Sequence, residues 1–502
     1  MPRIARVTTP VEGVIQPTVA VPVTFDDGEA FVADSIPKIL GGHTLPRSFP
    51  QAWCLQQGLK EEPGSAVVIR SFVGLNVALV TVGSTPNDLE HYRLAGAAAV
   101  RCAGDTSVAF LLPTDGLDEP AAVTQALVEG ALLSSYSYKD TGGDLTFDVV
   151  PLGVPLPSVE THDDVVTGVH RGSVVAGAVN WAKALINTPA GDLTPKKLAK
   201  AALKRLAGDE HVEVEVWNEA RIEEERLGGL MGVGRGSGQP TRLVRATYDP
   251  HPGKDLAHVA LVGKGVTFDS GGLSIKTAEG MKAMKTDMTG AAVVLAALSV
   301  ASRLGLDVRV TAIAPMTENL SGDDAMKPGD VLTIRNGQTI EVLDTDAEGR
   351  LLLADGLSLA VEANPDAIVD IATLTGAQTV ALGDEIGAFF ATTEQLASYF
   401  KAASAQSGEP LWRMPLHPSY EAHLESDIAD MKNTGKPGKG GMISAALLLQ
   451  RFTDARPWVH LDIAGPGRSE AMRGYTTKGA TAFGARTIVA FLIAVAAAAE
   501  QS

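Results

Sequence analysis

Short apolar runs that alternate with helix-like segments constrain the fold of this 502-residue chain more than any other feature. In the second half of the chain, residues that favour strands are separated by stretches with helical periodicity; the runs are 259–262, 308–313, 367–371 and 458–463. This alternation is typical of a central sheet, mainly parallel, that is flanked by helices. We therefore expect an α/β fold.

A proline-rich stretch, 151–157, predicts a linker between two domains. Before it, the apolar runs 66–70 and 77–82 alternate with helix-like segments such as 89–99. These patterns predict a smaller N-terminal α/β domain. This domain contains no cluster of potential ligands, so its sequence indicates no function.

After the proline-rich stretch, residues 164–186 form one long helical pattern that stops at Asn187-Thr-Pro189. Thr194-Pro195 then predicts the start of another helix, with Thr194 as the N-cap. We divide the chain into an N-terminal α/β domain, a linking helix and a larger C-terminal domain built on the central sheet, with the bounds 1–163, 164–190 and 191–502.

Two glycine-containing segments need separate interpretation. The strand-like runs 331–334 and 339–343 flank Asn336-Gly337, which predicts a hairpin with a type I′ turn. The run 232–238 has glycine at alternate positions but lacks the third glycine of a dinucleotide-binding motif, so we expect a flexible loop there.

The overall charge and the cysteine content indicate which environment suits the chain. There are 42 basic and 59 acidic residues, for a formal net charge of -17, which disfavours nucleic acid as a partner. Two cysteines are too few for a disulfide framework. The first residues do not read as a signal peptide, and the apolar tract 488–499 is too short to span a bilayer and predicts a buried helix. We expect a cytoplasmic protein that does not enter a membrane.

Ionisable residues crowd into two segments that follow strand-like runs. The first, 261–276, contains Lys264, Asp269 and Lys276 and is followed by Asp287; the second is 344–350. Ligands of α/β sheets bind beyond the carboxyl ends of the strands, which is the position predicted for the first segment. Gly265, Gly271 and Gly272 would allow the tight turns that bring Asp269 inward.

The second segment is interpreted as extended backbone, so Asp346, Glu348 and Arg350 would share one face. Two carboxylates about 7 Å apart repel each other unless a positive charge lies between them. Together with Asp269 and Asp287 they supply about four negative charges at neutral pH. Two divalent cations would cancel these charges, and a pair of metal ions that share carboxylates is a hydrolytic arrangement.

The basic residues fit around such a metal pair. One lysine beside a metal ion can lose its proton and become a ligand. A second lysine and Arg350 would stay cationic and stabilise charge that develops on a substrate. The sequence lacks the H-E-x-x-H motif of zincins and the G-x-S-x-G motif of serine hydrolases. Its histidines are scattered, and His460, on an apolar strand, is interpreted as a core histidine.

The two segments resemble the signatures of the leucyl aminopeptidase (M17) family. Residues 344–351, Asp-Thr-Asp-Ala-Glu-Gly-Arg-Leu, differ at one position from that family's signature, and residues 263–272 match its other metal-binding segment. Further matches are at 187–189, 430–433, 460–465 and 479–484. The resemblance covers about residues 165 to 500 and implies a C-terminal catalytic domain.

This resemblance implies five metal ligands. Asp269 and Glu348 would bridge two divalent ions, Lys264 and Asp287 would complete the more readily exchanged site, and Asp346 would bind the other ion. Zinc, manganese and magnesium all tolerate oxygen-rich ligands.

The resemblance also implies the catalytic and substrate-binding groups. Lys276 would polarise the scissile carbonyl group, and Arg350 would hold a bicarbonate ion that acts as the general base. Met284, Thr373 and Ala464 resemble the lining of an apolar pocket for the first side chain, which suits leucine. Peptides with a free N-terminus would be the substrates, in intracellular peptide turnover, and a homohexamer is the expected assembly.

One residue departs from the family pattern, and three other functions compete with this one. Asp344 stands where the family usually has Asn, which predicts intact activity with altered metal affinity or pH profile. A catalytically dead scaffold is disfavoured because all seven metal and catalytic positions are filled. A two-metal phosphoesterase would not need Lys276 and Arg350 in this spacing. Nucleic-acid binding by the N-terminal domain would show as a salt-dependent gel shift.

Overall fold

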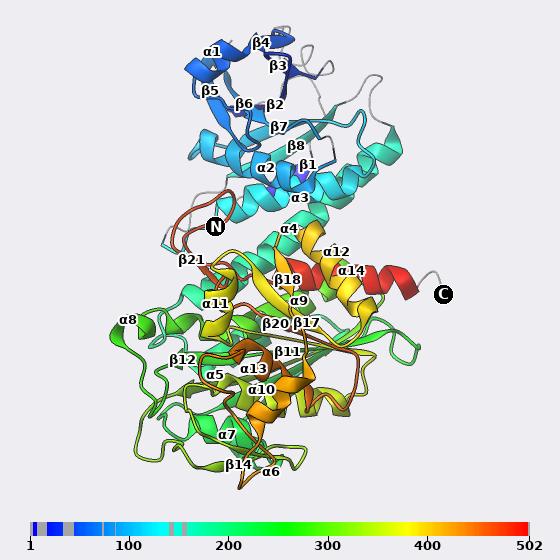
Figure 1. The fold of residues 1–502 in the computed structure, drawn as a ribbon. Helices are drawn as coiled ribbons and strands as arrows, with labels where there is room; N and C mark the ends of the chain where they lie inside the picture. The colour runs from blue at the N-terminus through cyan, green and yellow to red at the C-terminus, as the bar shows by residue number, and fades with distance from the viewer. Residues whose placement is uncertain are drawn as a thin grey trace. The chain divides into compact units, whose positions relative to one another are not determined.

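The computed structural model describes residues 4–7, 18–33, 45–72, 75–85, 87–139, 145–152 and 158–499. The chain divides into two compact units (Figure 1). The first comprises Met1–Asn180 and Glu470–Lys478, and the second comprises Trp181–Ser469 and Gly479–Ser502. Most of the predicted proline-rich linker, 153–157, lies outside the described residues.

The first unit contains a mixed sheet. Over the described residues the strand order is β1 (Ile4–Val7), β8 (Thr146–Leu152), β7 (Val108–Pro113), β2 (Thr18–Asp26), β3 (Glu29–Val32) and β4 (Ser48–Pro50). β6 (Leu75–Thr81) also pairs with β2, and β5 (Ala66–Phe72) pairs with β6. The helices are α1 (Gln51–Gln56), α2 (Leu89–Ala103) and α3 (Pro120–Ser134). The predicted N-terminal α/β fold is confirmed.

Helix α4 (Val159–Asn187) starts five residues before the predicted helix and ends one residue after it. It begins in the first unit and ends in the second. The next helix, α5 (Pro195–Leu206), has Thr194 as its N-cap and proline at its first turn, although the Thr194 side chain makes no capping hydrogen bond.

The second unit is built on a larger mixed sheet whose centre is parallel. Its order is β18 (Leu411–Arg413), β17 (Gly387–Ala391), β20 (Trp458–Asp462), β16 (Ala367–Ala372), β11 (His258–Gly263), β13 (Arg309–Asn319), β10 (Arg242–Tyr248) and β9 (Val212–Trp217). β12 (Gly265–Asp269) also pairs with β13. The strands from β20 to β13 are parallel to one another, and antiparallel strands flank them. The predicted mainly parallel sheet is therefore confirmed at its centre.

Two groups of helices pack against this sheet. One group shares a buried core with Ala260 and Val262 of β11: α6 (Glu219–Glu224), α7 (Gly228–Gly234), α10 (Gly349–Glu362) and α13 (Gly441–Gln450). The other group is centred on α9 (Thr289–Leu304), which contacts α5 and α14 (Ala485–Ala499), while α12 (Glu394–Ser407) contacts α14. Only one described helical stretch, Met284–Leu304, is long and apolar enough to cross a membrane, and 83% of that window is buried inside the fold.

Several short helices and strands lie outside the central sheet. They are α8 (Ala278–Met281), the 3-10 helices η1 (Met284–Met288) and η2 (Pro418–Leu424), α11 (Gly376–Leu382), β19 (Met431–Lys432), β21 (Arg468–Ser469) and β22 (Gly479–Ala480).

The glycine run at 232–238 was predicted as a flexible loop, and that prediction is wrong for its first three residues, which end α7. A Cβ atom on Gly236 would lie 1.9 Å from the carbonyl oxygen of Leu320, so close backbone packing requires glycine here.

The predicted hairpin is formed by β14 (Val331–Thr333) and β15 (Thr339–Glu341), which pair antiparallel. The predicted type I′ turn is wrong. That turn needs positive φ at two central residues, but Gly337 has φ 91° and Asn336 is not among the residues with positive φ. The Asn336 side chain instead accepts a hydrogen bond from the amide of Gln338, 3.0 Å away, which holds the asparagine in an ordinary conformation.

Candidate metal centre

The first acidic segment lies at the carboxyl ends of neighbouring strands, as predicted. Lys264 separates β11 from β12, and Asp269 is the last residue of β12. Gly271 (φ 87°) and Gly272 (φ 65°) then turn the chain in the left-handed region, as the sequence predicts. Gly265 does not have positive φ, so its role was misjudged: a Cβ atom there would lie 2.4 Å from the carbonyl oxygen of Pro315.

One oxygen of Asp269 is held by the protein and the other faces a lysine. Oδ1 accepts hydrogen bonds from the amide of Gly271 and from Nδ2 of Asn319, both at 2.8 Å. Oδ2 lies 2.8 Å from Nζ of Lys276, which also forms an ion pair with Asp346. Asn319 was not identified from the sequence, because only the pairing of β13 with β12 brings it beside Asp269.

The second acidic segment is not extended, so the predicted alternation of its side chains is wrong. Residues 344–348 form a turn, and α10 begins at Gly349, which places Arg350 in the first turn of a helix. Asp344 Oδ1 accepts a hydrogen bond of 2.9 Å from the amide of Asp346 and so stabilises the turn. Asp346 and Glu348 converge because the chain bends at a helix N-terminus.

Two further residues fix this turn. Asn433, which follows β19, accepts a hydrogen bond from the amide of Leu343 (2.8 Å) and donates to the carbonyl oxygen of Asp344 (2.6 Å). Thr345 donates from its hydroxyl group to the carbonyl oxygen of Gly271, 2.6 Å away, and thereby joins the two acidic segments.

Lys264 connects the remaining two acids. Its Nζ lies 2.8 Å from Asp287 Oδ1, 2.7 Å from Glu348 Oε1 and 3.2 Å from the carbonyl oxygen of Thr373. Thr373 also donates from its hydroxyl group to Asp287 Oδ1, 2.7 Å away. Asp287 belongs to η1, immediately before α9.

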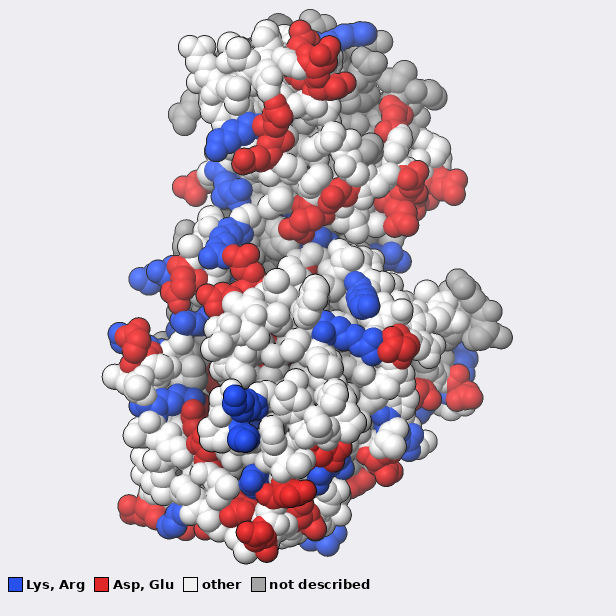
Figure 2. All heavy atoms as spheres, in the orientation of Figure 1, with Lys and Arg blue, Asp and Glu red and all other residues white. Residues whose placement is uncertain are grey.

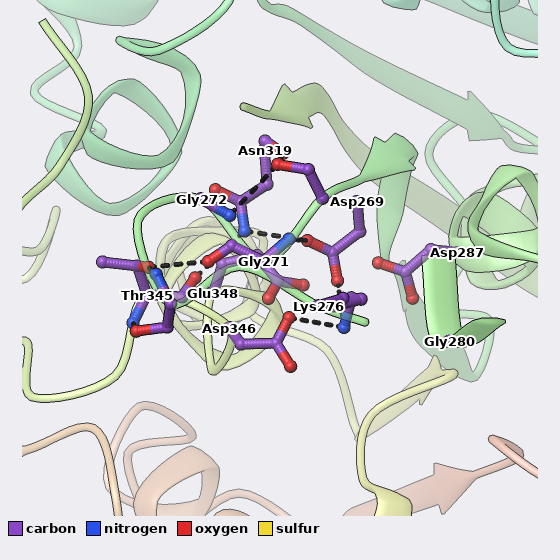
Figure 3. A network of polar contacts seen from close by, with 12 residues as sticks. Asp269, Gly271, Gly272, Lys276, Gly280, Asp287, Asn319, Thr345, Asp346 and Glu348 are labelled. Carbon is purple, nitrogen blue, oxygen red and sulfur yellow. Dashed lines mark hydrogen bonds and ion pairs between the residues drawn. The ribbon is translucent and has the colours of Figure 1, made fainter. Parts of the chain in front are cut away.

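The acidic side chains therefore form one cluster (Figure 3). Ligand oxygens of Asp269, Asp346 and Glu348 lie within 4.8 Å of one another, and Asp287 lies beside them. Each of the two lysines contacts two of the four carboxylates. Two buried oxygens, Asp287 Oδ2 and Glu348 Oε2, have no hydrogen-bond partner among the described residues.

Burial makes the charged forms of these acids costly. Burial, reinforced by the neighbouring Asp269, raises the pKa of Glu348 to about 8. Burial also raises the pKa of Asp287 to about 6 and shifts the pKa of Asp346 in the same direction. For Lys264 and Lys276, burial by itself lowers the pKa, but the surrounding carboxylates outweigh it and raise the pKa.

This arrangement fits divalent metal ions. Carboxylate oxygens are suitable ligands for hard or borderline cations. A buried oxygen without a partner normally costs stability, because it has lost its hydrogen bonds to water. Cations between the acids would give Asp287 Oδ2 and Glu348 Oε2 a partner and would lower the raised pKa values.

Arg350 lies beside this cluster, and not all of the hydrogen-bond donors of its guanidinium group have a partner among the described residues. Its Nη1 donates a 2.7 Å hydrogen bond to the carbonyl oxygen of Asn433. Its Nε is buried and has no partner among the described residues, and burial lowers the pKa of the guanidinium. A buried cation with a free donor is suited to an anion.

The residues predicted for the substrate pocket come from three separate elements. Met284 is the first residue of η1, Thr373 follows β16 directly, and Ala464 lies two residues after β20. β16 and β20 are parallel neighbours, so Thr373 and Ala464 leave the sheet at the same edge. His460 is a core histidine, as predicted: it is fully buried, and its Nδ1 lies 2.6 Å from Asp370 Oδ1.

Comparison with known proteins identifies the family of this chain. Residues 180–489 match the model of the cytosol aminopeptidase family, catalytic domain, and residues 52–141 match the model of that family's N-terminal domain. A probable cytosol aminopeptidase of Leifsonia xyli is 45% identical over 426 residues, which is 82% of this chain and 84% of that protein.

Solved structures show the same likeness along nearly the whole chain. A tomato leucine aminopeptidase mutant has a TM-score of 0.83 and 31% identity, over 98% of this chain and 96% of that one. The bottromycin maturation enzyme BotP in complex with Mn has a TM-score of 0.82 and 36% identity, over 96% and 99% of the two chains. The chain described here therefore belongs to the cytosol aminopeptidase family of peptide-hydrolysing enzymes.

Proposed function

We propose that this enzyme uses two divalent metal ions to release N-terminal amino acids, preferably leucine and other apolar residues, from peptides. The family supports metal-dependent aminopeptidase activity. The finer proposal rests on one observation: two lysines and four acids share one buried cluster that leaves two carboxylate oxygens unpaired.

The ligands divide between the two ions. Asp269 and Glu348 would bind both ions, as the resemblance of their segments to the family signatures implies; their ligand oxygens and that of Asp346 lie within 4.8 Å of one another. Asp346 would complete one site. Lys264 and Asp287, which contact each other at 2.8 Å, would complete the other, with Lys264 as a neutral amine. When bound, the ions supply Lewis acidity and a water that is deprotonated near neutral pH.

Lys276 is the group proposed to act on the substrate. In the cluster it contacts Asp269 and Asp346, and 17% of its side chain is exposed, whereas Lys264 is 4% exposed. The more accessible ammonium group can reach the scissile carbonyl oxygen, polarise it and stabilise the negative charge that develops there.

Arg350 is proposed to hold a bicarbonate ion that accepts the proton of the attacking water. Two observations support this role: the guanidinium is buried, and its Nε has no partner among the described residues. An anion held there would balance a buried positive charge. Met284, Thr373 and Ala464 would then line the pocket for the first side chain.

The family and the composition support the remaining proposals. The ions would be manganese, zinc or magnesium, and the manganese complex of BotP supports manganese. We propose a cytoplasmic homohexamer that acts in intracellular peptide turnover. On the face shown in Figure 2, acidic and basic side chains of the described residues are intermingled, without a continuous basic surface, which disfavours nucleic acid as a partner. We also propose that the N-terminal domain ends at residue 163 and that the linking helix ends at residue 190.

Metal analysis combined with a panel of aminoacyl substrates tests this function. The purified protein should contain two ions per chain and should hydrolyse leucine amide faster than glycine amide. N-acetylated leucine amide should not be cleaved, because a blocked amine cannot bind a metal ion. A chelator should abolish the activity, and added manganese should restore it. Equal cleavage of blocked and free substrates would contradict the proposal.

A further inference from the structure

A buried carboxylate, Asp462, joins the two loops that carry Thr373 and Ala464. Asp462 is the last residue of β20 and is fully buried. It pairs in register with Ala372, the last residue of the neighbouring strand β16. One loop therefore leaves each strand at this point, and the Asp462 side chain lies between the two loops.

Both oxygens of Asp462 accept hydrogen bonds from these loops. Oδ1 accepts from the backbone amides of Leu374 (3.1 Å), Thr375 (3.3 Å) and Ala464 (3.3 Å). Oδ2 accepts from the hydroxyl group of Thr375 at 2.6 Å. The same carboxylate thus holds the backbone of both loops, through charge-assisted hydrogen bonds at a fully buried position.

A second contact joins the same loops. Gln378, in α11, is fully buried and accepts a hydrogen bond of 2.6 Å from the amide of Gly465. The Thr375 hydroxyl group in turn accepts a bond from the amide of Gln378, 3.1 Å away, as the N-cap of α11. The loop after β16 and the loop after β20 are therefore joined both through Asp462 and through Gln378.

We propose that Asp462 is a positioning residue that determines specificity, because it fixes the separation of Thr373 and Ala464 and so the width of the pocket for the first side chain. This inference rests on the proposed function, in which those two residues line the pocket. Asp462 makes no hydrogen bond to the proposed metal ligands in the described structure. Thr373, in a loop that Asp462 holds, does contact Lys264 and Asp287, so the test compares two substrates of the same variant, for which a shared change at the metal site cancels. Loops that are joined only through Gln378 would fit leucine less well, whereas glycine has no side chain to place.

Asp462→Ala removes all four hydrogen bonds and provides the test. At saturating manganese, the ratio of kcat/KM for leucine amide to kcat/KM for glycine amide should fall about tenfold, which is typical of losing a group that orients the residues of a site. Most of this change should be an increase in the KM for leucine amide. Metal content should stay at the wild-type value. Asp462→Asn, which keeps an oxygen for the amide donors, should recover most of the ratio.

Thr375→Val is the second variant if Asp462→Ala does not fold. It removes one bond to Asp462 and the N-cap bond from the amide of Gln378, and it should lower the ratio by a smaller factor, which Thr375→Ser should restore. If the wild-type enzyme prefers leucine but folded Asp462→Ala and Thr375→Val keep the wild-type ratio, Asp462 does not determine the width of the pocket and the inference is overturned. If the wild-type enzyme shows no such preference, the proposed pocket fails first and this inference fails with it.

Discussion

Two buried acids of α10 have opposite relationships with their surroundings. Glu348 stands directly before the helix and Asp355 lies inside it, and they are 1% and 0% exposed. Asp355 accepts a hydrogen bond at each oxygen, from the backbone amides of Leu230 (2.8 Å) and Arg335 (2.9 Å). Glu348 contacts Lys264 with one oxygen, while its other oxygen has no hydrogen-bond partner among the described residues.

Equal burial therefore does not imply an equal role. Burial raises the pKa of both acids, to about 8 for Glu348 and to about 7 for Asp355. Each oxygen of Asp355 therefore has a hydrogen-bond donor, whereas Oε2 of Glu348 has none among the described residues. A buried acid whose oxygens are all satisfied connects segments of the fold, whereas a buried acid with a free oxygen is available to a metal ion.

The largest effect is expected for Glu348→Gln. The variant keeps the side chain's size but removes a charge that would bind both metal ions. Activity on leucine amide should fall more than about a hundredfold, which exceeds the usual effect of losing a residue that hydrogen-bonds to a metal ligand. Metal analysis should show that ions are lost. A folded variant with full metal content and activity would contradict the role of Glu348.

Lys276→Ala should separate a cation that acts on the substrate from one that binds metal. We expect kcat to fall about 100- to 1000-fold, as for loss of a group that stabilises developing charge, with both ions still bound. Arg350→Ala should likewise lower turnover without metal loss. Metal loss in either variant, measured on the purified protein, would mean that the roles are wrongly assigned.

Asp355→Ala should have the opposite profile. It leaves the amides of Leu230 and Arg335 without an acceptor, at a cost of about 1–3 kcal/mol for each group. The free energy of unfolding in urea should fall accordingly, while metal content and kcat per folded molecule stay the same. Loss of metal with unchanged stability would remove the distinction between the two acids.

The pH dependence of stability sharpens the same point. The pKa of Asp355 is about 7 in the folded chain, against an ordinary value of 3.8. A raised pKa in a folded acid means that the stability gained from protonation is complete below about 3.8 and is lost as the pH rises through about 7. With chelator present, the wild type should therefore lose more stability between pH 4 and 7 than Asp355→Asn does. Parallel stability curves would show that Asp355 does not titrate in this range.

The smallest effect is expected for Asp344→Asn. Asparagine can still accept the hydrogen bond from the amide of Asp346, but it removes a negative charge near the metal ligands. A long-range interaction of about 0.5–1 kcal/mol corresponds to a few-fold weaker manganese affinity. Calorimetric titration of the metal-free protein should show this difference at low salt and a smaller one at high salt. Equal affinities at low salt would show that the charge is fully screened.

Much of the site was accessible from the sequence, because strand ends and acidic segments are local features. Lys264 was placed correctly after the strand β11, whereas the strand β12, which ends at Asp269, was not predicted. The extended interpretation of 344–350 failed because Glu348 is not a typical N-cap residue, so the start of α10 was not recognised. The error did not separate Asp346 from Glu348, because the turn brings them together as well.

The residues that were missed act across long sequence separations. Asn319 reaches Asp269, which is 50 residues away, and Asp462 reaches Leu374, which is 88 residues away. Neither asparagine nor aspartate at a strand end predicts by itself which hydrogen-bond partners it will meet. Only the pairing of β12 with β13, and of β16 with β20, decides these contacts.

The sequence by itself determined the α/β architecture and the kinds of residue available for chemistry, since apolar periodicity and side-chain charge are properties of short segments. Only the tertiary structure decided which carboxylate oxygens are paired. Hydrogen-bond donors for a buried acid come from other segments of the chain, and packing brings them to Asp355 but not to one oxygen of Glu348.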